Sequence, residues 1–157
     1  MTKDMIKDYT LRITQTSETG LIVVMYDLAL DYIKSAKKIY AEGTHAEYRQ
    51  ECMRAVKVIH ELMSTLDFNY EISRPLYRIY EYISKEITSC YIKNCTDGLD
   101  VASRFMESLR ESFDKISLQD EKGPVMGNTQ SVYAGLTYGK GVLNENITVD
   151  SNRGFTV

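Results

Sequence analysis

Apolar residues recur at steps of three and four along most of residues 17–116, which is the spacing of one face of a helix. The first such stretch lies between Ser17 and Gly43. Serine is favoured just before a helix, and glycine commonly follows the last turn. The pattern therefore predicts a first long helix, with its main apolar face at Leu21, Met25, Leu28, Tyr32, Ala36 and Ile39 and a wider band at Ile22, Ala29, Ile33 and Tyr40.

A second helix is predicted to begin at Thr44, because Glu47 three residues later completes a capping-box pattern. Its main stripe is predicted at Met53, Val56, His60, Met63 and Leu66, with Cys52, Ile59 and Leu62 beside it. A third helix starts near Arg74 with Pro75 in its first turn, where a missing amide costs little. Its predicted face is Leu76, Ile79, Tyr80, Ile83, Ile87 and Cys90 or Tyr91. A fourth helix starts near Thr96 or Asp97 and presents Leu99, Ala102, Phe105, Leu109, Phe113 and Ile116.

Long helices joined by short connections favour an antiparallel, up-down-up-down arrangement, so the predicted fold class is an all-α, antiparallel four-helix bundle. The chain changes character after Gln119, since six of the nine glycines lie from Gly123 onward. We expect three parts: an N-terminal segment over 1–16 that packs on the bundle, the bundle itself over 17–120, and an irregular, glycine-rich C-terminal extension over 121–157 that is docked or flexible.

Composition excludes several classes of function. The net charge of −3 provides no basic field for nucleic acid. The longest apolar run, Leu21 to Met25, is far shorter than a membrane-spanning helix, and the N-terminus has no apolar signal region. Three cysteines, at 52, 90 and 95, fit neither a disulfide framework nor a zinc site. These features predict a soluble protein of the reducing cytoplasm.

No pattern of catalytic residues is present. The sequence from His60 to Ser64 approaches a zinc-protease helix, but serine stands where the second histidine is required, and His45 is the only other histidine. The glycines at 135, 139 and 141 lack the strand-to-helix setting of a nucleotide loop. We therefore expect no enzymatic activity, no metal and no cofactor.

The connection between the second and third predicted helices is unusual because it carries two large aromatic residues, Phe68 and Tyr70. The chain also holds twelve tyrosines and seven methionines. Such residues either fill the edge of a core, with hydroxyls reaching water, or form a surface that accepts another chain. The second interpretation favours a binding protein.

Four fragments, in register, resemble the FliS family of flagellar secretion chaperones. They are Ile6-Lys7-Asp8-Tyr9, the stretch from Gln15 to Asp27 with Ser17, Leu21, Tyr26 and Asp27, the helix and loop from Glu61 to Ser73, and the helix from Leu76 to Asn94 with Ile79-Tyr80-Glu81-Tyr82-Ile83. Phe113 stands where the family often has tryptophan, Glu18 at its usual proline and Leu28 at its glycine. The resemblance covers most of residues 6–116.

The resemblance implies a cytoplasmic chaperone that binds the C-terminal segment of flagellin, prevents premature polymerisation and aids delivery to the flagellar type III export apparatus, with an export-gate component as a further partner. Ile6 and Tyr9 would act as a displaceable cover. The other residues that we expect at the groove or its edge are Leu21, Met25, Tyr26, Leu62, Met63, Leu66, Phe68, Tyr70, Leu76, Tyr80 and Ile83. The alternative function is a helical adaptor or regulator that binds another amphipathic helical partner. The sequence leaves open whether the protein is a monomer or a homodimer, and whether the tail is a cis cover, a docking peptide or a dimerising arm.

Overall fold

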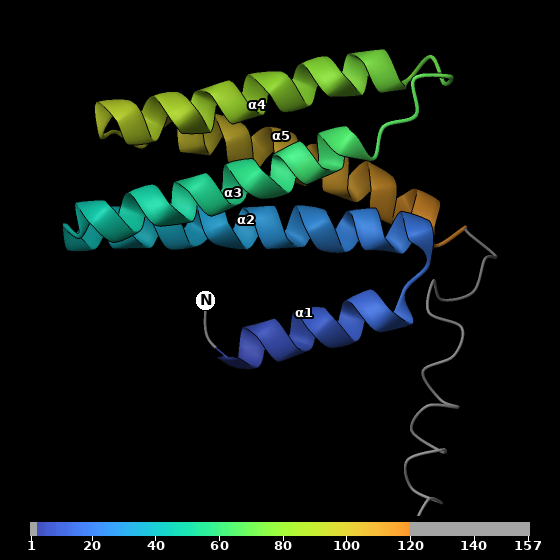
Figure 1. Cartoon of the computed structure of the whole chain (residues 1–157), viewed down its shortest axis with the longest axis horizontal. Coiled ribbons are helices and arrows are strands. Elements are labelled where there is room, and N and C mark those ends of the chain that lie inside the picture. The colour runs from blue at the N-terminus through green and yellow to red at the C-terminus, as the bar shows by residue number, and fades with distance from the viewer. Residues whose placement is uncertain (1–2, 120–157) are drawn as a thin grey trace, which may run out of the picture. The chain divides into compact units, whose positions relative to one another are not determined.

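Five helices make up the part of the chain that the structure, a computed structural model, describes, which is residues 3–119 (Figure 1). Helix α1 spans Lys3–Gln15, α2 Glu18–Glu42, α3 His45–Ser64, α4 Ser73–Lys93 and α5 Asp97–Ser117. No strand occurs among these residues. The predicted extension over 121–157 lies outside the described residues.

Helices α2 to α5 form a four-helix bundle. Helix α2 packs on α3, α3 on α4 and α4 on α5, and α5 closes the ring against α2. The connections are the short segments 43–44, 65–72 and 94–96, so consecutive helices run antiparallel, as Figure 1 shows. The predicted all-α bundle is confirmed.

The core lies between the four helices and combines large side chains with small ones. Its alanines, at 29, 36, 55 and 102, reduce the bulk between helices where their axes approach. At the centre the hydroxyls of Tyr26 and Tyr80 form a hydrogen bond across the bundle, from α2 to α4. The remaining buried members are Ile33, Tyr48, Cys52, Ile59, Leu62, Leu76, Ile83, Ile87, Cys90, Leu99 and Met106.

The predicted main stripe of α3 is wrong by part of a turn, whereas Cys52, Ile59 and Leu62, which are predicted beside it, are buried. Met53 is 51% exposed and His60 is also exposed, with its Nε2 3.1 Å from Ser84 Oγ. The buried positions instead step by four and three from Tyr48 through Cys52, Ala55 and Ile59 to Leu62. This face includes two small side chains, so a search for large apolar residues selects the neighbouring positions.

The predicted faces of the other helices are correct to different degrees. On α5, Phe105 and Ile116 are exposed, while Met106, absent from the predicted face, is fully buried. On α2, Ala29, Ile33 and Ala36 are buried, while Leu21, Met25, Leu28 and Tyr32 are half-buried. On α4 the predicted face is confirmed, with Leu76, Tyr80, Ile83, Ile87 and Cys90 buried.

The helix ends test the predicted caps. Ser17 Oγ accepts a hydrogen bond from the amide of Gly20 at 3.2 Å, and Gly43 has φ of 81°, so both caps of α2 are confirmed. Thr44 does precede α3, but its side chain makes no capping hydrogen bond, so the predicted capping box is wrong. Asn94, with φ of 55°, ends α4 in the left-handed conformation that asparagine tolerates.

Within the described residues, every helix is too short or too polar to cross a bilayer.

Candidate partner-binding surface

Helix α1 packs against α2 through a mixed polar and apolar face. The ring of Tyr9 is buried, with 7% of the residue exposed, and its hydroxyl donates a hydrogen bond to Asp31 Oδ2 at 2.6 Å. The guanidinium of Arg12, one turn further along α1, lies over the Tyr9 ring at 5.5 Å from its centroid. Tyr9 therefore supplies both the main buried contact and one polar anchor of α1.

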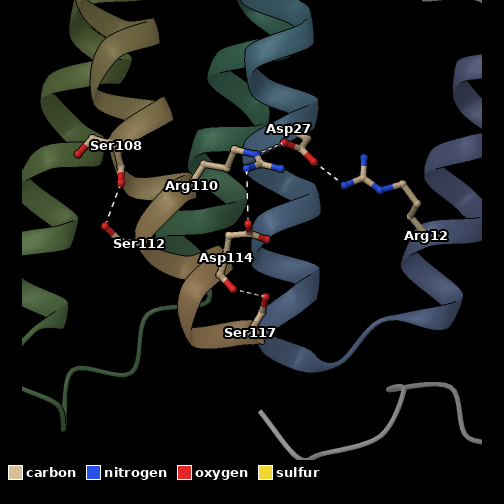
Figure 2. Close-up of polar contacts among 7 residues, drawn as sticks. All are labelled: Arg12, Asp27, Ser108, Arg110, Ser112, Asp114 and Ser117. Carbon is tan, nitrogen blue, oxygen red and sulfur yellow. Dashed lines mark hydrogen bonds and ion pairs between the residues drawn. The ribbon is translucent and has the colours of Figure 1, made fainter. Parts of the chain in front are cut away.

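A second anchor joins three helices, as Figure 2 shows. Asp27 on α2 forms an ion pair with Arg12 on α1 through one carboxylate oxygen and with Arg110 on α5 through the other. Arg110 also lies 3.9 Å from Asp114, one turn along α5. The side chain of Asp27 is 18% exposed, whereas the two arginine side chains are about twice as exposed, at 37% and 34%. One carboxylate thus connects α1 to the bundle and also connects α2 to α5.

These contacts determine the protonation of the groups involved. Partial burial acts to raise the pKa of Asp27, but hydrogen bonds from Arg110 and Arg12 outweigh it and leave the pKa below its usual value of 3.8. The pKa of Tyr9 is raised by burial and by the hydrogen bond to Asp31. Asp27 is therefore ionised and Tyr9 neutral at physiological pH.

Cavities border both ends of α1. Near its N-terminal end a cavity of about 420 Å³ lies between α2 and α3, lined by Met5, Asp31, Tyr32, Lys34, Ser35, Lys38 and Glu51. Near its C-terminal end a cavity of about 300 Å³ is lined by Arg12, Gln15, Thr16, Gly20, Val23, Val24, Asp114 and Ser117. The surface of α2 beneath and beside α1 is thus hollowed at two places.

The connection between α3 and α4 presents the unusual aromatics to solvent. Phe68, Tyr70 and Ile72 are each more than half exposed, and the Phe68 ring lies 5.9 Å from that of Tyr77 on α4. Asp67 organises the loop, since its carbonyl oxygen accepts from Ser73 Oγ at 2.6 Å and its carboxylate from the amide of Asn69 at 3.0 Å. An ordered loop thereby holds an exposed apolar patch, which we call the loop patch: Phe68, Tyr70, Ile72 and Tyr77.

The structure distributes the predicted binding residues over several environments. Tyr26, Leu62, Tyr80 and Ile83 are almost fully buried core residues, and Leu76 is 7% exposed. Leu21, Met25, Met63 and Leu66 are half-buried, and Phe68 and Tyr70 belong to the loop patch. Ile6 lies on α1, and its side chain is outside the described part of the structure.

Sequence reasoning named Tyr9 as part of the cover but missed the polar residues of α1 and α2 that attach the helix together with it. Asp27 and Asp31 are four residues apart on α2, and Tyr9 and Arg12 are three apart on α1, so each pair lies on one helix face. Two acids at this spacing, flanked by apolar residues in the first half of the helix, are a signal that the sequence contains. Glu51, a buried acid on α3, was also missed.

The described residues offer little for metal or redox chemistry. They contain no cluster of histidine, cysteine, aspartate and glutamate suited to a metal ion, and the three cysteines there are free thiols. Burial raises the pKa of Cys52 and of Cys90 to about 11, so both are protonated at neutral pH.

Comparisons with known proteins agree with this description. Residues 3–120 match the family model described as "Flagellar protein FliS". The chain is also similar to the flagellar secretion chaperone FliS of Bacillus subtilis (strain 168), at 24% identity over 102 residues that cover 65% of this chain and 76% of that protein. The matched region includes all five described helices. The chain belongs to the FliS family of flagellar proteins.

Proposed function

We propose that this protein is a cytoplasmic export chaperone that binds the C-terminal segment of flagellin, prevents its premature polymerisation and aids its delivery to the flagellar type III export apparatus. Family membership and the name of the Bacillus subtilis relative support the role of secretion chaperone. The structural observation that carries the proposal is the attachment of α1, an amphipathic helix that lies on α2 through one buried tyrosine and a partly exposed ion pair.

A helix attached in this way can be exchanged for another. The described contacts of α1 with α2 include the hydrogen bond from Tyr9 to the Asp31 carboxylate, a partly exposed ion pair and the buried Tyr9 ring, and they are less extensive than the packing inside the bundle. An amphipathic segment from a partner can form helix-in-groove contacts on the same surface. The bundle beneath stays rigid because its core does not depend on α1.

The predicted residues then take two roles. Ile6 and Tyr9 on α1 act as the displaceable cover, and Leu21, Met25, Met63 and Leu66 line or border the surface that accepts flagellin. Tyr26, Leu62, Leu76, Tyr80 and Ile83 shape that surface from within the core. Phe68 and Tyr70 form its edge or contact a second protein.

Calorimetric titration of the purified chain with a peptide of the flagellin C-terminal segment tests the proposal. We expect binding by the wild type and a clear change of affinity in the double variant Ile6→Ala with Tyr9→Ala. Leu11→Ala is the matched control, because Leu11 is on the same helix but 54% exposed. Lack of binding by the wild type would overturn the flagellin role, and an unchanged affinity in the double variant would overturn the cover role of α1.

An export-gate component is proposed as the second partner, and the loop patch supports it because an exposed apolar cluster commonly marks a protein contact. Phe68→Ser with Tyr70→Ser should reduce flagellin export in cells without changing the affinity for the flagellin peptide. A loss of peptide affinity would place the loop patch in the flagellin site instead. Unchanged export would remove its role in delivery.

A further inference from the structure

Glu51 on α3 is a buried acid with only half of its carboxylate paired. The residue is 5% exposed, and its Oε1 forms an ion pair with Arg54 on the next turn of the same helix. Its Oε2 is fully buried and has no hydrogen-bond partner in the structure. A buried oxygen left without a donor is costly, and such atoms are few in native proteins.

The unpaired oxygen belongs to a residue that lines the cavity between α2 and α3. That cavity, of about 420 Å³, has room for a large side chain, and Met5 of α1 lies on its border. An amphipathic segment that replaces α1 would therefore pass beside Glu51. A residue with an unpaired acceptor therefore lies beside the path of the proposed partner.

The charges around the cavity indicate what kind of donor would fit. Among the described residues, its lining contains two acids, Asp31 and Glu51, and two lysines, Lys34 and Lys38. Arg54 adds a further positive charge at Glu51 itself. This excess of positive charge would repel an incoming ammonium or guanidinium group. It would not repel an uncharged amide or hydroxyl.

We propose that Glu51 Oε2 accepts a hydrogen bond from an uncharged donor, an asparagine, glutamine, serine or threonine side chain, of the amphipathic segment that the protein binds. The inference rests on the proposed function, with the C-terminal segment of flagellin as the occupant. Glu51 is then a specificity residue, because a segment with an apolar residue at this position leaves the oxygen unpaired in the complex as well.

The test compares two properties of the full-length chain: the Kd for the flagellin C-terminal peptide and the thermal unfolding midpoint of the free protein. Glu51→Met removes both oxygens at similar side-chain length, and Glu51→Leu, which also lacks an acceptor, serves if the methionine variant does not fold. Glu61→Met is the control, since Glu61 is an exposed acid of the same helix. We expect Glu51→Met to raise the Kd roughly tenfold or more while the unfolding midpoint stays or rises.

Two results overturn the inference while the proposed function stands. The first is an unchanged Kd in Glu51→Met. The second is a higher Kd together with an equally clear fall of the unfolding midpoint, because this combination indicates a merely structural role for Glu51. Absence of wild-type binding overturns the proposed function and this inference with it.

A peptide scan identifies the donor. One substitution of asparagine, glutamine, serine or threonine by alanine should weaken binding to the wild type and have no further effect on Glu51→Met, as a double-mutant cycle requires of a direct contact. Coupling to a lysine or an arginine of the peptide would overturn the inference that the donor is uncharged.

Discussion

Replacing Asp27 by asparagine should loosen α1 more than it weakens the bundle. The substitution removes the charge that both Arg12 and Arg110 contact. Exposed ion pairs contribute about 0.2–1 kcal/mol, whereas loss of one partner from a fully buried pair costs about 3–5 kcal/mol. Asp27 is largely buried but its partners are about one-third exposed, so we expect a total loss of about 1–2 kcal/mol.

Amide hydrogen exchange of the full-length chain measures this loss helix by helix. If about 1 kcal/mol of this total falls on the attachment of α1, its open population, and hence the exchange of its amides, increases roughly 5-fold. Arg12→Gln should produce a large part of this effect, because it removes only the α1 arm of the anchor. Arg110→Gln should spare α1 and reduce global stability instead.

Asp100→Asn is the matched control. Asp100 pairs with Lys37 between α5 and α2, and both side chains are well exposed. We expect no change in the exchange of α1. If the α1 amides of Asp27→Asn and Arg12→Gln exchange at the wild-type rate, the ion pair does not hold the helix.

The pH dependence of α1 attachment follows from the same carboxylate. The folded-state pKa of Asp27 lies below its unfolded value of 3.8, so its contribution is complete above that value and is lost as the pH falls through the folded value. The acid-induced release of α1 below about pH 4, followed by the NMR signals of α1, should therefore be larger in the wild type than in Asp27→Asn. An equal acid transition in both proteins would assign it to another group.

Three further predictions concern the bundle, and each is checked by chemical denaturation. Ile59→Ala should cost about 2–5 kcal/mol because it leaves a cavity in the core, while Met53→Ala on the exposed face should cost little. Tyr26→Phe leaves the Tyr80 hydroxyl buried without its partner and should cost about 1–3 kcal/mol, much of it recovered when Tyr80→Phe is added. Gly43→Ala should cost about 1 kcal/mol, since φ of 81° strains any residue with a Cβ. Near-zero effects at Ile59, Tyr26 or Gly43 would contradict the corresponding reasoning.

The long helices could be predicted because their signals are local. Ser17, through its side-chain oxygen, and Gly43, through its backbone conformation, act within one turn, and the face of α4 consists of apolar residues at regular helical spacing. The rotation of α3 could not be read in the same way. Ala55 is buried because a neighbouring helix approaches there, while the larger Met53 faces solvent. The size of the apolar side chains therefore predicts the wrong buried face where a helix packs closely against its neighbour.

The site was harder to predict because it depends on pairs that are distant in sequence. Tyr9 and Asp31 are 22 residues apart, and Arg110 and Asp27 are 83 apart. Asp27, Asp31 and Arg110, each taken alone, resemble ordinary exposed polar side chains. Their role follows only from the packing of α1 and α5 on α2, which the spacing of apolar residues does not encode.

The hydroxyl pair of Tyr26 and Tyr80 has a consequence for how this sequence can evolve. The pair fixes the axial register between α2 and α4, because a shift of one helical turn would bury two hydroxyls without partners. Loss of either hydroxyl alone penalises the fold, whereas loss of both is much less costly. Positions 26 and 80 are therefore expected to change together among related sequences, with two tyrosines or two apolar residues more often than one of each.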